Sequence, residues 1–483
     1  MKSLDEISNT HIKALACDVL QLLPYEPNEQ QLGAIVAIAQ YLTYSDERSL
    51  MLLSGYAGTG KTSLTGAIVK ALSQAGVKCV LLAPTGRAAH IFSEYSGHPA
   101  FTIHRKIYRQ KGYGSTAFNL AENKHTRTLF IVDEASMIAN MPGDQAATFG
   151  TGRLLDDLIT YVYNGQGCRL LLMGDDAQLP PVGQVESPAL NENLMQAYGF
   201  TVYHLYLNEI ARQESHSGVL HNATIVRQSM QDDECNTEQE PKLELEGCDD
   251  ITAVTGEFLL ETISDCYDRD GINDTIVITR SNKRATMFNQ GIRNSILYRE
   301  DELVAGDMLL VAKNNYYWAE EYENLDFIAN GDRARVLRVR NIRDLYGFHF
   351  ADITFSFPDY DNLEFTATTI LDSLQAEAPS LTREQNEKLF QNVMADYQHL
   401  PLKSDRFKAL RQDPYYNALQ VKYAYAVTCH KAQGGQWSHV YVDQGYMTDD
   451  MLTPDYIHWL YTAFTRATEK LFLVNWPKEQ VVK

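Results

Sequence analysis

Short apolar runs separated by stretches of helical periodicity dominate the first third of the chain. This alternation is typical of buried parallel strands that are connected by helices in an α/β layer. A second set of such runs returns towards the C-terminus. The pattern therefore predicts two α/β layers, with strands near residues 50–53, 77–82, 129–132 and 170–173 in the first layer and near 275–279, 440–442 and 471–474 in the second.

The segments outside these runs follow other patterns. Residues 1–48 have helical periodicity, while 300–372 hold short β-like runs and predict a small β unit that interrupts the second layer. A charged helical excursion is expected at about 373–413. Residues 229–250 carry nine acids and one lysine, and we interpret them as an exposed connection, with a functional acidic patch as the less favoured alternative. The domains expected from these patterns are 1–204, then 205–299 together with 419–483, and an insertion at 300–418.

Charge and composition narrow the class of protein. The chain has 483 residues, with 42 Lys and Arg against 62 Asp and Glu, so its net charge is −20. Taken whole, such a chain is repelled by nucleic acid unless a local basic segment offsets the charge. An apolar leader and a membrane-spanning run are both missing from the sequence, so we expect a cytoplasmic protein without membrane association. Seven scattered cysteines without a C-x-x-C pattern predict reduced thiols and neither zinc nor iron–sulfur binding.

A phosphate-binding pattern follows the first predicted strand. Residues 55–62 read GYAGTGKT, which is G-x-x-x-x-G-K-T between a strand and a helix. Its glycines let backbone N–H groups converge on phosphate oxygens, and the helix N-terminus adds positive potential. Lys61 is expected to reach the β- and γ-phosphates, and the Thr62 hydroxyl is expected to bind Mg²⁺. The alternative, a chance Gly-rich turn, is disfavoured by the strand and helix around it.

Two carboxylates end the strand predicted at 129–132. Asp133 at such a strand tip can bind the metal, and Glu134 can polarise the attacking water. Taken alone, the pair could be two solvated loop acids. After the phosphate-binding pattern, they predict a nucleoside triphosphatase, without indicating which kind.

Three later motifs carry a resemblance to a known family. Residues 174–183 read GDDAQLPPVG, 425–436 read YAVTCHKAQGGQ, and 461–467 read YTAFTRA. In this order and spacing, the motifs resemble those of superfamily 1 helicases of the RecD-like 5′→3′ branch, closest to the phage Dda-type DNA helicases, over roughly residues 25–475. The resemblance implies an α/β protein with two RecA-like P-loop NTPase domains. It further implies a β-hairpin, or pin, inserted in the first domain at 105–128, and an SH3-like β subdomain with a helical arm inserted in the second.

The resemblance implies an ATP and Mg²⁺ site shared by the two domains. Glu134 matches the catalytic base, Gln178 the γ-phosphate sensor, and Arg212 and Arg466 the two arginines directed at the γ-phosphate, although a bare arginine is more often a surface residue. The residues that match the adenine, triphosphate and metal contacts are Gln31, Gly58, Thr59, Gly60, Lys61, Thr62 and Asp133. Gly434 and Gln436 match a further nucleotide-contacting pair, but the family more widely has Glu at the position of Gln436.

Nucleic-acid contacts are implied in the same way. The segments that resemble motifs Ia, Ib and V are 83–89, 102–104 and 425–436. Short hydroxyl and imidazole donors suit the backbone of a single strand without reading its bases. For His104, the alternative is a hydrogen-bonded structural histidine. The matching residues are Pro84, Thr85, Thr102, His104, Thr428 and His430.

A basic segment stands out against the acidic chain. Residues 102–128 hold six basic residues and one acid, a net of +5, interleaved with aromatic residues, as in stacking sites for single strands. This segment corresponds to the pin that splits the duplex in the family. We predict that Tyr113 or Phe118 is the wedge; the equally weighted alternative is an aromatic residue that packs the hairpin onto the body. The arm at 373–413 is expected to pack against the pin.

These features predict an ATP-dependent DNA helicase that translocates 5′→3′ on single-stranded DNA and unwinds forked duplex DNA. The direction follows from the resemblance alone. One alternative is a single-strand-stimulated ATPase that displaces proteins without processive unwinding, and another is a non-catalytic P-loop scaffold. We expect a monomer, and a single-strand-binding or replication or repair protein is the kind of protein partner that fits.

Overall fold

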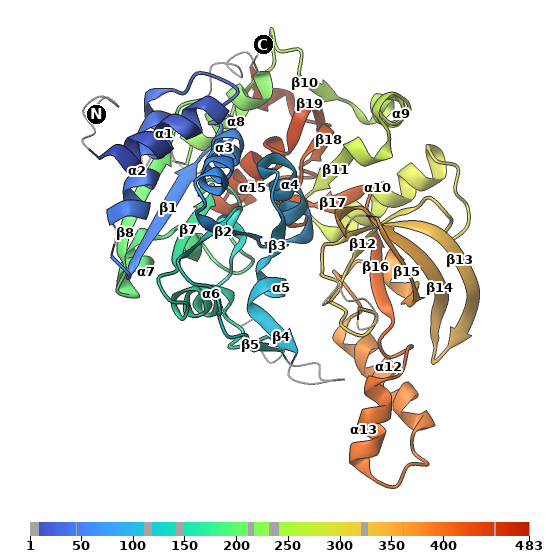
Figure 1. Ribbon diagram of the computed structural model, residues 1–483. Coiled ribbons are helices and arrows are strands. Elements are labelled where there is room, and N and C mark those ends of the chain that lie inside the picture. The colour runs from blue at the N-terminus through green and yellow to red at the C-terminus, as the bar shows by residue number, and fades with distance from the viewer. Residues whose placement is uncertain are drawn as a thin grey trace.

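The computed structural model describes residues 9–44, 46–110, 118–141, 149–210, 217–230, 241–319, 327–360, 362–448 and 451–482. These residues form two parallel α/β sheets and a closed barrel, with a helical arm that projects from the barrel (Figure 1). None of the helices in these ranges is long and apolar enough to cross a membrane.

The first sheet has six parallel strands in the order β3-β2-β6-β7-β1-β8. Its strands are β1 (Ser49–Gly55), β2 (Lys78–Ala83), β3 (Ala100–Thr102), β6 (Thr128–Val132), β7 (Arg169–Gly174) and β8 (Thr201–Leu207). The helices of this region are α1 (Thr10–Leu22), α2 (Glu29–Tyr44), α3 (Lys61–Gln74), α4 (Gly86–Ser96), α5 (Ile103–Ile107), α6 (Leu154–Tyr163) and α7 (Glu192–Ala197). Because the strands are parallel, the segments that follow β1, β2, β6 and β7 all emerge at one edge of the sheet.

The second sheet has five parallel strands in the order β10-β19-β18-β11-β17. These are β10 (Ile251–Val254), β11 (Thr275–Thr279), β17 (Ala426–Thr428), β18 (Trp437–Asp443) and β19 (Ala467–Val474). The helices are α8 (Gly218–Gln228), α9 (Gly256–Asp270), α10 (Asn282–Ser295), α14 (Cys429–Ala432) and α15 (Pro454–Phe464). The two parallel sheets confirm the two α/β layers predicted from the apolar runs.

In the sequence, a barrel and an arm are inserted between strands β11 and β17 of the second sheet. The barrel strands are β12 (Met308–Val311), β13 (Arg333–Leu345), β14 (Phe348–Phe357), β15 (Leu363–Ile370) and β16 (Leu419–Tyr423), and all their pairings are antiparallel except β15 with β16. The arm helices are α11 (Asp372–Gln375), α12 (Arg383–Asp396) and α13 (Lys403–Arg411). Leu389, Val393 and Leu410 of the arm share a buried cluster with Phe348 and Phe350 of the barrel.

Two short strand pairs complete the fold. The antiparallel pair β4 (Tyr108–Gln110) and β5 (Phe118–Leu120) stands where the hairpin insertion is expected, although the connection between them, 111–117, lies outside the described residues. The parallel pair β9 (Leu243–Glu244) and β20 (Val481–Val482) places part of the acidic segment 229–250 in a strand. The expected packing of the arm against the pin stays a prediction.

Two of the expected boundaries are wrong. β8 belongs to the first sheet and extends through Leu207, so a boundary at 204 cuts this strand. β16 closes the barrel by pairing with β12, so the chain returns to the second sheet at Ala426 and not at 419. Residues 419–428 form one continuous apolar-rich run without a turn signal, so the sequence does not reveal where the chain changes from one sheet to the other.

Candidate nucleotide and nucleic-acid sites

A polar pocket lies between the edge of the first sheet where its strands end and the start of β19 in the second sheet. Predicted site residues from both sheets line it together: Gly58, Gly60, Lys61, Thr62, Asp133, Glu134, Gln178, Gln436 and Arg466. The sequence motifs are more than 400 residues apart at their extremes, so only the fold brings these side chains to one place.

The phosphate-binding loop has the backbone shape that its glycines permit. Gly58 and Gly60 have φ values of 74° and 77°, in the left-handed region that favours glycine. A Cβ atom on Gly60 would lie 2.5 Å from the Tyr25 hydroxyl, so a side chain there would displace Tyr25 as well as strain the backbone. Lys61 begins α3, and its ammonium group donates to the carbonyls of Gly55 and Tyr56. The loop therefore surrounds an anion site at a helix N-terminus, with a lysine beside it.

Gln31 and Thr59 stabilise this loop with hydrogen bonds. The side-chain amide of Gln31 donates to the Thr59 carbonyl at 2.9 Å, and its oxygen accepts from the Asn28 amide. The Thr59 hydroxyl donates back to Tyr56. Gln31 is buried behind the loop and is not among the residues that line the pocket, so its predicted contact with adenine stays a prediction.

Asp133 and Glu134 follow β6 and line the pocket as half-buried carboxylates. Oδ2 of Asp133 accepts from the Tyr95 hydroxyl at 2.5 Å, and Oδ1 accepts from the backbone N–H of Glu134 at 2.8 Å. Glu134 has φ of 51°, a costly backbone conformation for a residue other than glycine that is often found at functional sites. Burial raises the pKa of both carboxyl groups, while Lys61 opposes this shift for both and Arg466 opposes it for Glu134.

The donor set fits a divalent cation shared with a nucleotide. Among the described residues, no group of three or more His, Cys, Asp or Glu side chains could hold a metal ion by itself. Asp133 and Thr62 line the same pocket, and Mg²⁺ typically takes one or two protein oxygens and completes its shell with phosphate and water. A cation here would also offset the desolvation of these two carboxylates.

Gln178 and Arg466 face this pocket from opposite domains. Gln178 follows β7, and its Oε1 is buried with no hydrogen-bond partner within the described structure. Arg466 is 3% exposed, and its guanidinium donates to the carbonyls of Thr462 and Gly435 and to the Thr465 hydroxyl. A fixed arginine fork and an unpaired amide oxygen are both suited to a charged ligand between the domains.

Besides Gln31 and Thr59, Gly434 is a predicted nucleotide contact that does not line the pocket. Gly434 lies instead against α4, where a Cβ atom would be 3.1 Å from the Ala88 Cβ and 3.3 Å from the Thr85 hydroxyl. Arg212 lies outside the described residues and stays a prediction. Gln436 does line the pocket, and its carbonyl accepts from Arg87 at 2.7 Å.

The predicted nucleic-acid contacts begin at two helix N-termini of the first domain. The Thr85 hydroxyl caps α4 by accepting from the Ala88 N–H, and the Thr102 hydroxyl caps α5 by accepting from the Arg105 N–H. Pro84 directly precedes this cap of α4. The approach of Gly434 to Thr85 brings the resembled motifs Ia and V side by side across the domain interface.

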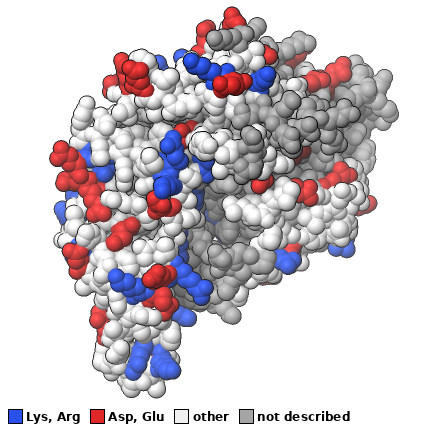
Figure 2. Space-filling view, turned by 180° about the vertical axis from the view of Figure 1, so that it is seen from behind, with Lys and Arg blue, Asp and Glu red and all other residues white. Residues whose placement is uncertain are grey.

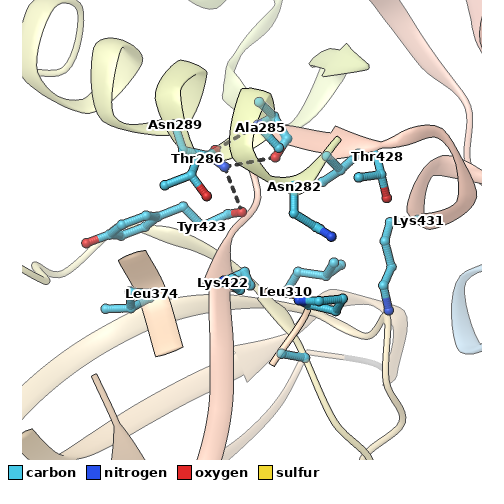
Figure 3. A pocket seen from close by; sticks show the side chains of 14 residues that line it. Asn282, Ala285, Thr286, Asn289, Leu310, Leu374, Lys422, Tyr423, Thr428 and Lys431 are labelled. Carbon is cyan, nitrogen blue, oxygen red and sulfur yellow. Dashed lines mark hydrogen bonds between the residues drawn. The ribbon is translucent and has the colours of Figure 1, made fainter. Parts of the chain in front are cut away.

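A second pocket adjoins these contacts in the other domain (Figure 3). Thr428 lines it together with residues that the sequence analysis missed: Asn282 and Thr286 of α10, Lys422 of β16 and Lys431 of α14. Burial lowers the pKa of Lys422 and of Lys431 to about 8. His430 is exposed on the same short helix. The sequence contains little that marks these lysines as pocket residues, because Lys422 belongs to a barrel strand that reaches the pocket only in the folded chain.

An aromatic cluster overturns one reading of the hairpin. Phe118 is 6% exposed and packs against Phe149 and Tyr316, with ring centroids 4.9 and 5.1 Å apart. The prediction of Phe118 as an exposed wedge is therefore wrong, and the alternative of an aromatic residue that packs the hairpin onto the body holds. Tyr113, the other candidate, lies outside the described residues.

His104 belongs to the same cluster. The centroid of its ring lies 4.9 Å from that of Phe149, 5.7 Å from that of Tyr108 and 6.1 Å from that of Phe327. Burial lowers the pKa of His104 to about 4, so the imidazole is neutral near pH 7. This environment favours the structural role over a contact with phosphate. The cluster joins the hairpin base to the segment between β12 and β13 of the barrel.

Charge is distributed unevenly over the molecule. Arg105 and Lys106 of the basic segment lie over the Phe101 ring, 5.7 and 5.5 Å from its centroid. In the view from behind, acidic and basic side chains are interspersed over much of the coloured surface, and basic ones gather at the end of the projecting arm (Figure 2). The exposed basic residues of α13 are Lys403, Lys408 and Arg411.

The fold and the shared pocket define the chain as a P-loop NTPase with two α/β domains. A family model described as an AAA domain matches residues 27–236, and one described as a UvrD-like helicase C-terminal domain matches residues 423–474. These two matches fall on the two sheets. Together with the relatives below, they confirm the resemblance to superfamily 1 helicases of the RecD-like, Dda type.

Three curated relatives are similar to the chain. The ATP-dependent RecD2 DNA helicase of Deinococcus radiodurans is 34% identical over 160 residues, which cover 32% of this chain and 19% of the relative. The ATP-dependent DNA helicase dda of Enterobacteria phage T4 is 26% identical over 274 residues, which cover 55% of this chain and 57% of the relative. Uncharacterized protein R530 of Acanthamoeba polyphaga mimivirus is 23% identical over 498 residues, which cover 87% and 94%. The match thus spans about a fifth of the RecD2 helicase and little more than half of the phage helicase.

Solved structures of Pif1 helicases are also similar. One, described as a structural basis for DNA unwinding at forked duplex DNA by two coordinating Pif1 helicases, is 16% identical with a TM-score of 0.47, covering 95% of both chains. A Pif1 helicase from Bacteroides in complex with ADP-AlF3 and single-stranded DNA is 15% identical with a TM-score of 0.45, also over 95% of both chains.

Proposed function

We propose that this protein is an ATP-dependent DNA helicase that translocates 5′→3′ on single-stranded DNA. The observation that supports this most directly is the shared pocket: Lys61, Glu134 and Gln178 of the first sheet face Arg466 of the second. Hydrolysis in such a pocket depends on how the two domains sit against each other, which lets ATP turnover drive a change in their contact.

The chemistry follows from the residues that line the pocket. Backbone amides of 58–62 and the Lys61 ammonium would hold the triphosphate, and Thr62 and Asp133 would hold Mg²⁺, which supplies charge neutralisation at the β- and γ-phosphates when bound. Glu134 is the base that orients the attacking water, and its raised pKa brings it closer to working pH. Arg466, and Arg212 by resemblance, would stabilise the charge that develops on the γ-phosphate.

The strand path would run over the contact between motifs Ia and V. Thr85 and Thr102 would contact phosphates from the first domain, and Thr428, Asn282 and Lys431 from the second. Lysine ammonium groups and hydroxyls at this pocket suit a phosphate backbone and do not read bases. The names of the RecD2 and phage relatives, both ATP-dependent DNA helicases, support DNA as the polymer.

The insertions are proposed to separate the strands. In this view, the β4–β5 hairpin is the pin, Tyr113, which lies between β4 and β5 in the sequence, is the wedge, and the barrel with its arm is an SH3-like subdomain that supports it. The aromatic cluster around Phe118 would anchor the hairpin base to the barrel segment between β12 and β13. A translocase without unwinding shares the motor but does not need the tip.

The test is ATP turnover with and without single-stranded DNA. Wild type should hydrolyse ATP and be stimulated by the strand, and Lys61→Ala should lose turnover while it still binds the strand. Lys70→Ala, an exposed lysine on the same helix α3, is the matched control and should behave as wild type. A wild-type protein without ATP turnover would contradict the proposal and favour a P-loop scaffold.

A further inference from the structure

One tyrosine hydroxyl joins the phosphate-binding loop to the segment that follows β7. Tyr461, on α15 of the second domain, accepts a hydrogen bond from the Ala57 N–H at 2.9 Å. The same hydroxyl donates to Oδ2 of Asp175 at 2.8 Å. Tyr461 and Asp175 are each 1% exposed, so water does not replace either bond.

The direction of both bonds is fixed by chemistry. A backbone N–H can only donate, so the Tyr461 oxygen must accept from Ala57. Its single proton then goes to the Asp175 carboxylate. Burial and the neighbouring carboxylate raise the pKa of Tyr461 well above its usual value, which keeps the phenol protonated and able to donate. One hydroxyl therefore satisfies a loop amide and a buried carboxylate at once.

Neighbouring side chains of the second domain extend this contact along the loop that follows β7. The His458 Nδ1 lies 2.8 Å from the Ala177 carbonyl, and the Thr462 hydroxyl accepts from the Leu179 N–H at 2.7 Å. Gln433 donates to the Leu179 carbonyl at 2.7 Å. Side chains of the second domain therefore make hydrogen bonds to the backbone of Ala177 and Leu179, the two neighbours of Gln178.

The same helix leads directly to the arginine at the pocket. α15 ends at Phe464, and Arg466 donates back to the Thr462 carbonyl at 3.1 Å. Thr462 thus contacts the loop after β7 with its hydroxyl and Arg466 with its carbonyl. A shift of the phosphate-binding loop or of Asp175 relative to α15 would consequently move Arg466 relative to Glu134.

We propose that Tyr461 is a positioning residue that couples the phosphate-binding loop to Arg466. Its hydroxyl would fix α15 against Ala57 and Asp175 when the domains are closed, so that Arg466 meets the γ-phosphate. This inference rests on the proposed function, since it assigns a role within the same ATPase cycle. Tyr461 does not contact the triphosphate in this account, so nucleotide binding does not depend on it.

The test replaces only the hydroxyl. Tyr461→Phe keeps the ring in the buried core and leaves the Ala57 N–H and the Asp175 carboxylate without this partner. Two lost hydrogen bonds, one to a charged group, should lower kcat with saturating single-stranded DNA by about tenfold or more. The dissociation constant of a fluorescent ATP analogue should change less than about twofold, since the loop amides and Lys61 are intact.

Tyr441→Phe is the matched control. Tyr441 is also fully buried, and its hydroxyl lies 3.3 Å from the Cys266 sulfur, within the second domain. It should keep the wild-type kcat. The inference is overturned if Tyr461→Phe retains the wild-type kcat, or if it loses nucleotide binding far more than Tyr441→Phe, because the tyrosine would then not act by positioning Arg466.

A double-mutant cycle with Asp175→Asn separates coupling from simple damage. If the hydroxyl acts through Asp175, Tyr461→Phe should cost clearly less in the Asp175→Asn background than in wild type. Additive losses in kcat would contradict the coupling. Absence of turnover in wild type would contradict the proposed function itself, whereas normal turnover with an unaffected Tyr461→Phe contradicts only this inference.

Discussion

The hydroxyl of Tyr95 donates a hydrogen bond of 2.5 Å to Oδ2 of Asp133, and this bond connects the proposed metal ligand to the helix that starts at the predicted nucleic-acid contacts. Tyr95 lies in the last turn of α4, whereas Thr85 caps the first turn of the same helix. Tyr95 also stacks on Phe92, with centroids 5.1 Å apart, which fixes the ring. A single helix of 11 residues thus connects a proposed phosphate contact to the proposed metal site.

Tyr95→Phe should raise the Mg²⁺ concentration needed for half-maximal ATP turnover by roughly tenfold, since hydrogen-bond partners of ligating carboxylates typically contribute that much to metal affinity. The phenyl ring keeps the stacking on Phe92, so stability should change little. Magnesium titrations of the ATPase check this. An unchanged magnesium requirement would show that Tyr95 does not orient Asp133.

His104 predicts a pH-dependent stability. Its pKa is lowered to about 4 in the folded protein against about 6.5 in the unfolded chain, so the unfolded state binds the proton more readily. The stabilisation is therefore present above about pH 6.5 and is lost as the pH falls towards 4. His104→Phe should show a smaller drop in Tm than wild type between pH 7.5 and 5. Equal drops in thermal melts would mean that the aromatic cluster does not hold His104 in its neutral form.

Asp332 predicts a change of stability with pH in the opposite direction. It is buried beside Tyr360, and burial raises its pKa to about 7, so the folded protein favours the protonated carboxyl group. Stability should fall as the pH rises from about 4 through 7. Asp332→Asn, which keeps an acceptor for Tyr360 and the Ala329 N–H, should be more stable than wild type at pH 8, with a smaller difference at pH 5.5. Identical melting temperatures at pH 8 would contradict this.

The two aromatic residues of the hairpin should behave differently. Phe118→Ala removes a buried ring and should cost about 3–5 kcal/mol in the free energy of unfolding. Tyr113→Ala should leave the Tm and the single-strand-stimulated ATPase near wild type but reduce unwinding of forked DNA. Denaturant titration and an unwinding assay check both variants. Full unwinding by Tyr113→Ala would remove Tyr113 as the wedge.

Contiguous motifs were predictable, and contacts between distant segments were not. The loop 55–62 and the pair Asp133–Glu134 carry their chemistry within a few residues, after a strand that fixes their direction, so the sequence indicated both the elements and the pocket. The hydrogen bonds of Tyr461 to Ala57 and Asp175 cross about 290–400 residues of chain. No local pattern distinguishes that tyrosine from other buried ones.

The same reason explains the wrong assignments. Phe118 lies in a basic, aromatic segment that looks exposed, and its burial depends on Phe149 and Tyr316, which come from other parts of the chain. The end of the barrel at Tyr423 is hidden because the next strand follows after two residues, without a change in composition.

The most direct measurement of the central claim is unwinding of duplexes that carry either a 5′ or a 3′ single-stranded tail. The account predicts ATP-dependent unwinding of the 5′-tailed substrate by wild type, little unwinding of the 3′-tailed one, and neither by Lys61→Ala. ATP turnover stimulated by single strands without unwinding of either substrate would contradict the helicase assignment, and unwinding of only the 3′-tailed substrate would contradict the direction.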